Sequence, residues 1–294
     1  MKKLIFLAMP FVMAFFLVLG CSNNDKNGTL HLNITGLVDL GEQYDYEGWV
    51  IVDGSPVSTG TFTVDANGDM NKANFEVSKD NLDNATKFVL TIEPMPDSDP
   101  NPSSTHIMAG SFDGDNAGLS VGDASALGDD FTDAMGSYIL ATPTNGGESN
   151  ENSGIWFLSL ATGSPAQGLD LPTLPAGWEY EGWAVYDGTP LTTGKFLNPD
   201  SSDLAAPYSS SEAAAPPFPG EDFLENAPTG MEFPIDLAGG TAVITIEPDP
   251  DNSTAPFGAL KPLVGAISAN ATDHTTYDMG NNADMFPTGT ATKQ

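Results

Sequence analysis

The residues of this chain whose type and spacing best suit metal binding are aspartates in turn-forming segments. Asp97 and Asp99 flank a serine, and Asp113 and Asp115 flank a glycine. Closely spaced carboxylates are ligands that Ca²⁺ prefers, so these four residues are candidate metal ligands. None of these turns has the full spacing of a calcium loop with its closing glutamate, and aspartate is common in turns that bind nothing. We therefore expect no required cofactor, with Ca²⁺ as an optional ligand.

Two glutamates hold equivalent places at the ends of apolar segments. Glu93 lies in Thr-Ile-Glu-Pro at 91–94, and Glu247 lies in the same four letters at 245–248. A carboxylate at a strand end can act as a general acid or base or bind a cation, but more often it accepts hydrogen bonds from turn amides. Catalytic carboxylate pairs are about 5 to 10 Å apart across a cleft, and these two belong to different halves of the chain. We expect them to be structural.

Common signatures of catalysis are missing from the sequence. The three histidines are far apart, and we find neither a Gly-x-Ser-x-Gly elbow nor a phosphate-binding glycine loop. The expectation is a non-catalytic binding, sensing or surface module. The alternative is a calcium-dependent or carbohydrate-active extracytoplasmic hydrolase, which would need two or more Asp or Glu side chains converging in a cleft.

The single cysteine, Cys21, ends a segment with the order of a secretory signal. A basic start at 1–3 precedes an apolar run at 4–20, and Val-Leu-Gly-Cys at 18–21 resembles the lipobox of bacterial lipoproteins. This pattern predicts a signal peptide at 1–20, lipidation of Cys21 and a polar tether at 21–27. An incidental thiol or a short membrane helix is the alternative, although about 17 apolar residues are at the lower limit for spanning a bilayer. The predicted location is the bacterial outer membrane, with the protein facing the periplasm or the cell exterior.

The chain is strongly acidic. It has 40 Asp and Glu against 9 Lys and Arg, for a formal net charge of −31. Nucleic-acid phosphates require clustered basic side chains, so nucleic acid is excluded as a partner. The expected partners are the membrane, through the lipid, and an envelope protein. The acidic surface suits basic partners or cations, although adaptation to a saline medium, in which its self-repulsion is screened, is the favoured explanation.

One structural unit occurs twice. Tyr-Glu-Gly-Trp at 46–49 returns at 180–183, followed in both copies by Asp-Gly and by Thr-Gly-x-Phe. Apolar runs are short, rich in Val, Ile, Leu, Phe and Thr, and bounded by turn residues, which is typical of β-sandwiches. The sequence predicts an all-β protein of two tandem immunoglobulin-like β-sandwiches, at 28–145 and 154–294, joined by a linker at 146–153. Trp49 and Trp183 are expected to anchor the cores, and the Asp-Gly pairs to form hairpin turns.

The predicted strands follow the apolar runs of both copies. They are 29–34, 47–52, 57–64, 74–77, 87–93, 106–112 and 137–142, then 155–160, 180–186, 191–196, 231–236, 242–247 and 263–268.

The second copy carries an insertion at 200–223. A loop of this length in a compact domain is usually functional or disordered. As a binding loop it would present Phe218 and Phe223 as apolar anchors; otherwise it is a tolerated surface insertion.

The repeated residues resemble the extracytoplasmic domain of anti-sigma-K factors. The resemblance rests on 46–49, Gly54, Pro56, Gly60, Phe62 and 91–94, and on their equivalents in the second copy. It implies the fold of that domain and a sensing or protein-contact role. In that family a membrane helix joins the outer domain to a cytoplasmic domain that grips a sigma factor, and the sequence has neither part. No sigma-factor contact is therefore expected.

Overall fold

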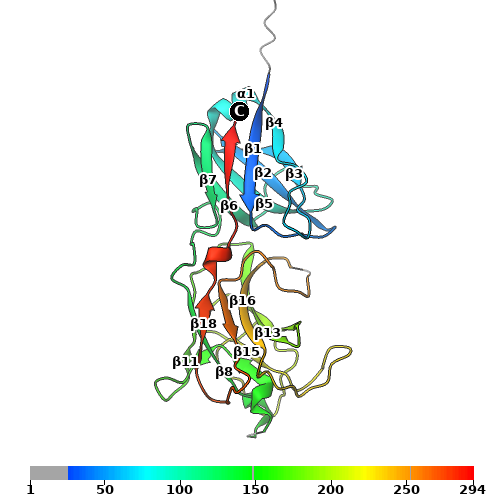
Figure 1. Ribbon diagram of the computed structural model, residues 1–294, viewed down its shortest axis with the longest axis vertical. Coiled ribbons are helices and arrows are strands. Elements are labelled where there is room, and N and C mark those ends of the chain that lie inside the picture. The colour runs from blue at the N-terminus through cyan, green and yellow to red at the C-terminus, as the bar shows by residue number, and fades with distance from the viewer. Residues whose placement is uncertain (1–25, 148, 252) are drawn as a thin grey trace, which may run out of the picture.

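The computed structural model describes residues 26–147, 149–251 and 253–294, which form two β domains along one axis (Figure 1). Most of the regular structure is strand, and all strand pairs are antiparallel. The helical segments are α1 (Lys79–Asn84) and the short 3-10 turns η1 (Pro143–Asn145), η2 (Glu151–Ser153) and η3 (Ala283–Met285). The prediction of an all-β protein with two tandem β domains is confirmed.

The first domain is one eight-stranded sheet in the order β3-β2-β5-β6-β7-β19-β1-β4. Its ends meet, because Phe62 of β3 and Phe75 of β4 pack with ring centroids 5.9 Å apart. The sheet therefore folds over on itself around a buried core. Its strands are β1 (Asn27–Thr35), β2 (Tyr44–Val52), β3 (Ser55–Phe62), β4 (Asn74–Ser78), β5 (Ala85–Pro94), β6 (His106–Asp113), β7 (Asn116–Ser120) and β19 (Thr288–Lys293).

The second domain repeats this order as β14-β13-β16-β17-β18-β8-β9-β15. The short strand β12 also pairs with β8, and β10 and β11 form a separate two-stranded sheet. Its strands are β8 (Met135–Leu140), β9 (Gly154–Trp156), β10 (Leu158–Ser159), β11 (Ala166–Gln167), β12 (Leu169–Asp170), β13 (Trp178–Tyr186), β14 (Thr189–Phe196), β15 (Gly220–Asp222), β16 (Thr241–Pro248), β17 (Leu263–Ala266) and β18 (Tyr277–Asn281).

The two copies exchange their last strands. β8 follows the first copy in sequence but lies between β18 and β9 of the second sheet. β19 follows the second copy but lies between β7 and β1 of the first sheet. The two strands hold equivalent positions in the two sheet orders, so the exchange is reciprocal. The chain consequently crosses between the domains twice.

This exchange differs from the predicted domain boundaries. The division between sheets falls before β8 and not at 146–153, and 288–293 completes the first domain. The predicted linker lies within the second domain, where Ser153 is fully buried. The repeat could not reveal this, because a strand has the same local pattern whichever sheet it joins.

The repeated Tyr-Glu-Gly-Trp letters have structural causes in both domains. Tyr46 and Tyr180 are fully buried, each stacked on a phenylalanine with ring centroids 5.4 Å apart. A Cβ at Gly48 would meet Thr59 Oγ1 at 2.6 Å, so only glycine fits. Trp49 and Trp183 are 3% and 2% exposed, as predicted for core anchors. Asp53-Gly54 and Asp187-Gly188 have positive φ and form the predicted hairpin turns.

Contacts at the crossings join the domains. The Asn281 side chain donates to the carbonyls of Phe131 at 2.7 Å and Ala134 at 2.9 Å, so the end of β18 is bound to the first crossing. Phe131 packs edge-on against Phe286 of the second crossing, with ring centroids 5.6 Å apart. A Cβ at Gly177 would come within 2.7 Å of Ser104, so the second domain approaches the first there.

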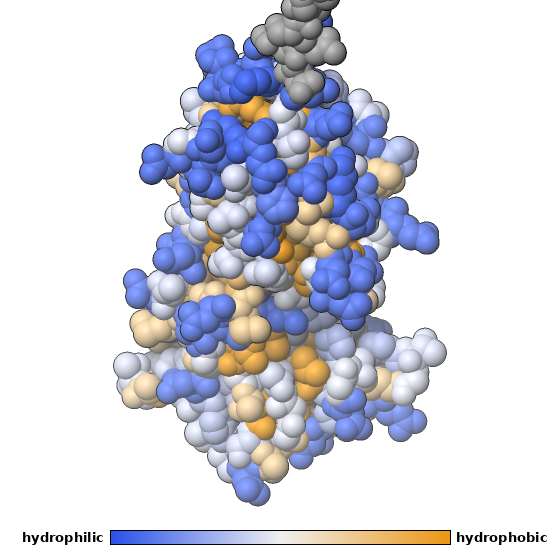
Figure 2. Space-filling view, turned by 45° about the horizontal axis from the view of Figure 1, so that its top comes forward, coloured by the Kyte–Doolittle hydropathy of each residue, from blue (hydrophilic) through white to orange (hydrophobic). Residues whose placement is uncertain are grey.

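The outer surface is mostly hydrophilic, as Figure 2 shows for one face, with small hydrophobic patches between polar side chains. Among the described residues, no helix is long and apolar enough to cross a membrane.

One predicted strand is absent. Residues 231–236 form irregular chain in which Ile235 is 9% exposed. The segment includes Pro234, which lacks the N–H that a ladder requires.

Candidate functional site

Three carboxylates converge in the second domain beside the junction with the first. Glu181, Glu247 and Asp251 each offer an oxygen, and the three oxygens lie within 4.8 Å of one another. Glu181 is 5% exposed and Glu247 1%. Among the described residues, these three carboxylates form the one group of three side chains close enough together to hold a metal ion.

Pairing of β13 with β16 brings the cluster together. Glu181 of β13 lies opposite Thr245 of β16. Glu247 follows Thr245 by two positions, so its side chain lies on the same face of the strand. Asp251 follows in the turn after β16. Both glutamates lie in letters that the two copies repeat, but only the strand register shows that Glu181 and Glu247 meet.

Hydrogen bonds fix two of the carboxylates and leave one oxygen free. Thr192 donates to Glu181 Oε1 at 2.5 Å, whereas the buried Oε2 of Glu181 has no hydrogen-bond partner. Glu247 Oε1 accepts from the Thr245 hydroxyl and, at 2.8 Å, from the Phe257 amide. The expected role of Glu247 as an acceptor for a turn amide is thus confirmed, and Glu93 does the same for the Ser103 amide at 2.8 Å.

Burial in a group of like charges raises the pKa values of these carboxyl groups. Desolvation raises the pKa of Glu181 to about 7, against hydrogen bonding from Thr192 and the positive charge of Lys195. Desolvation also raises the pKa of Glu247 to about 7, and the charges of Glu181 and Asp251 add to the effect. Both groups therefore titrate near neutral pH.

Lys195 supplies one positive charge at the edge of the cluster. Its ammonium lies 2.6 Å from Glu179 Oε1 and 3.1 Å from Asp251 Oδ2. One cation thus faces four carboxylates when all of them are ionised.

The first domain has equivalent carboxylates without the lysine. Glu47, Glu93 and Asp97 hold the equivalent positions, and desolvation together with the charges of Glu93 and Asp97 raises the pKa of Glu47. Thr61 stands where the second copy has Lys195. Asp97 is exposed, so this cluster is more open to water.

A groove of about 260 Å³ lies next to the second-domain cluster and is shared by both domains. The first domain contributes Val38, Leu40 and Tyr44, and the second contributes Phe257 together with Glu247 and Asp251. An apolar wall thus faces an acidic one, and the carboxylates have a route to solvent.

The four predicted metal ligands lie on the surface and outside this cluster. Asp97 and Asp99 accept hydrogen bonds from the amides of Asp99 and Asn101, each two residues further along, at 2.8 and 3.0 Å. Asp113 and Asp115 are exposed in the turn between β6 and β7. Their positions are those of turn-forming residues.

Of the predicted binding anchors, Phe218 is half-buried and Phe223 is withdrawn from solvent. Phe223 is fully buried and packs with Tyr208 and Phe233, with ring centroids 5.8 and 5.6 Å apart. Phe218 packs against the buried cluster around Trp156. The inserted segment ends in β15, an edge strand of the sheet, so its aromatic side chains face the core.

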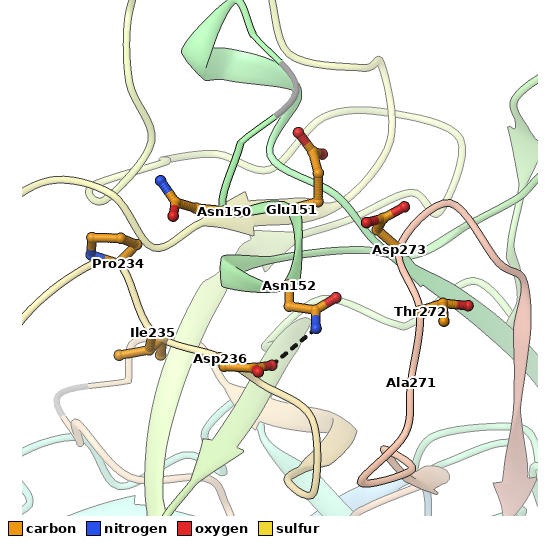
Figure 3. A pocket seen from close by; sticks show the side chains of 9 residues that line it. All are labelled: Asn150, Glu151, Asn152, Pro234, Ile235, Asp236, Ala271, Thr272 and Asp273. Carbon is orange, nitrogen blue, oxygen red and sulfur yellow. Dashed lines mark hydrogen bonds between the residues drawn. The ribbon is translucent and has the colours of Figure 1, made fainter.

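A second hollow of about 540 Å³ lies between three segments of the second domain (Figure 3). The Asn152 side chain donates to Asp236 Oδ1 at 3.0 Å, while Glu151 and Asp273 line the same hollow. Glu151 Oε2 accepts from the Thr142 amide at 2.9 Å. The hollow is polar and shallow, and we assign it no ligand.

Cys21 and the predicted signal peptide at 1–20 lie outside the described residues.

The fold and the site define a two-domain, strand-exchanged β protein with a carboxylate cluster at the domain junction. Residues 20–107 match the family model of the C-terminal domain of the anti-sigma-K factor RskA. The match covers the segment that holds most of the first domain, and the chain resembles that family there, as its repeated residues predicted. No curated protein and no solved structure matches the chain.

Proposed function

We propose that this chain is a lipid-anchored protein of the bacterial envelope that acts as a non-catalytic binding or sensing module. The observation that carries the proposal is the match of residues 20–107 to an anti-sigma-factor domain, which suggests a regulatory or sensing module. The lipobox at 18–21 supports an anchor at Cys21 in the outer membrane, facing the periplasm or the cell exterior. No sigma-factor or nucleic-acid contact is part of the proposal.

The groove between the domains is the binding surface that we propose for an envelope protein partner. Its apolar residues, Val38, Leu40, Tyr44 and Phe257, come from both copies, so a ligand there would contact both domains at once. Binding of such a ligand would depend on how the two domains are placed at their junction.

Two experiments test these two elements. Cys21→Ser is expected to move the protein from the membrane to the soluble fraction and to abolish labelling with radioactive palmitate. A photo-crosslinking residue at Ser253, which is exposed and lines the groove, is expected to capture an envelope protein in intact cells. The same residue at Thr162, exposed on the second domain and outside the groove, is the matched control. Equal capture from both positions, or none from either, would exclude the groove as the binding surface.

The hydrolase alternative has one observation in its favour, the convergence of Glu181, Glu247 and Asp251 beside the groove. Burial argues against glycoside hydrolysis, because Glu181 is 5% exposed and Glu247 1%, whereas both catalytic carboxyl groups must flank the scissile bond of the substrate. Hydrolysis of a polysaccharide or peptide by the purified protein, lost in Glu247→Gln, would establish it.

A further inference from the structure

The buried carboxylates at the domain junction carry more negative charge than their surroundings compensate. Glu179, Glu181, Glu247 and Asp251 together face the single ammonium of Lys195. Burying an unpaired carboxylate is costly, because the low-dielectric interior cannot replace its hydration. The cluster therefore needs either bound protons or a bound cation.

One atom of the cluster lacks any partner. Glu181 is 95% buried by accessible surface, and its Oε2 makes no hydrogen bond although its Oε1 accepts from Thr192. A buried oxygen without a donor is rare in folded proteins and calls for a specific explanation, such as an ion. The orphaned oxygen belongs to the same carboxylate that meets Glu247 and Asp251.

We propose that Glu181, Glu247 and Asp251 form a binding site for one divalent cation, and that the cation is Ca²⁺. Oxygens on opposite sides of a Ca²⁺ ion are at most about 5 Å apart, since each bond is about 2.3 to 2.6 Å long. The spread of 4.8 Å among the three carboxylates fits this range. Mg²⁺ requires shorter bonds of about 2.1 Å and a nearly ideal octahedron, so it fits less well.

The groove provides the path and the remaining ligands. Glu247 and Asp251 line it, so an ion can reach the cluster from solvent and keep water molecules on its open side. The carbonyl and carboxylate groups of an incoming partner could replace that water. The cation site does not depend on the groove having a protein partner, and either proposal can fail without the other.

The test is calorimetric titration of CaCl₂ into the full chain beyond the signal peptide, at pH 8. One Ca²⁺ per second domain is expected, with a rise in the melting temperature. Glu181→Gln and Glu247→Gln each keep the side-chain shape, and each is expected to weaken this binding at least tenfold. Glu47→Gln at the equivalent position of the first domain is the matched control and should leave the second-domain site intact.

Terbium luminescence gives an independent readout, because Trp183 is linked to Glu247 through Thr245. Excitation of tryptophan should produce Tb³⁺ emission that Ca²⁺ quenches by competition, and Glu181→Gln should remove this signal. If Glu181→Gln does not fold, Asp251→Asn in the turn after β16 takes its place. Absence of binding at millimolar Ca²⁺, or binding unchanged in these variants, would overturn the proposal.

Discussion

Trp183 and Glu247 are joined through one hydroxyl group. Thr245 Oγ1 accepts from Trp183 Nε1 at 2.8 Å and donates to Glu247 Oε1, and all three residues are buried. The first domain repeats this relay, with Trp49 donating to Thr91 at 2.9 Å and Thr91 donating to Glu93 at 2.5 Å. The relay connects a core anchor to the carboxylate that holds the following turn.

Thr245→Val should destabilise the protein by about 1 to 3 kcal/mol, because it leaves a buried indole N–H without its acceptor and leaves Glu247 Oε1 with the Phe257 amide as its remaining donor. Valine has nearly the shape of threonine, so lost packing contributes little. Urea unfolding measures the change. Thr292→Val, which removes a hydroxyl bonded to Asn116 in an exposed setting, is the control. An equal loss of unfolding free energy in the two variants would contradict the prediction that the buried relay stabilises the fold.

Stability should decrease as pH rises through neutrality. Burial raises the pKa of Glu181 and Glu247 from 4.5 to about 7, so the folded state favours their protonated forms. Their contribution is full below about pH 4.5 and is lost as pH rises through 7. Asp203, whose pKa burial raises to about 8, extends the loss upward. At about 1.4 kcal/mol per pKa unit, the shift corresponds to roughly 3 kcal/mol for either glutamate taken alone.

The measurement is the melting temperature between pH 5 and pH 8.5 in chelator-treated buffer. The charges that face the cluster are those of Glu179, Lys195 and Asp251, and these remain in the double variant Glu181→Gln with Glu247→Gln. That variant should show a flatter profile than the unmodified protein. Parallel profiles would assign the pH dependence to other groups.

The reciprocal strand exchange predicts that neither copy folds alone. A chain ending after Gly147 carries β8 without its sheet and lacks β19 of its own sheet, and the remaining fragment has the opposite defect. Mixed together, the two fragments should form a folded 1:1 complex. Size-exclusion chromatography and far-UV circular dichroism of each fragment and of the mixture would show this. Cooperative melting of either fragment alone would contradict the prediction.

Gly177→Ala should loosen the contact between the domains. The new Cβ would meet the Ser104 backbone at 2.7 Å, and the φ of +91° is unfavourable for alanine. The expected cost is about 1 to 3 kcal/mol, and hydrogen exchange should increase in the turns on both sides of the junction. Gly118→Ala is the control, because its Cβ would meet nothing within 4 Å. Equal exchange rates in the two variants would show that the contact is not needed.

Local sequence patterns predicted most of the longer strands, the hairpins and the tryptophan anchors, because these depend on alternation and turn residues that act over a few positions. The strands β7, β18 and β19 and the short strands β11, β12 and β15 were not predicted. The exchange of β8 and β19 was not predictable, since both strands have neighbours distant in sequence. The length of the insertion left a binding loop with Phe223 as an apolar anchor as one of two predictions, but three residues of regular strand precede Phe223 and its side chain is buried. The cluster of Glu181 with Glu247 required the register of β13 on β16.

The placement of the termini determines how the molecule would carry mechanical load. Gln294 and Thr29 exchange backbone hydrogen bonds of 2.8 and 2.9 Å, so the entering and leaving strands lie side by side at the end of the first domain away from the second (Figure 1). Force applied at the N-terminal end acts first on β1, which is held on both sides by β19 and β4. The chain enters the second domain before β8 and returns to the first domain before β19. Two covalent connections therefore join the domains, and both share tension applied to the second domain and resist its rotation. A tag fused at Gln294 would sit next to the entering strand, leaving the second domain and the groove unobstructed.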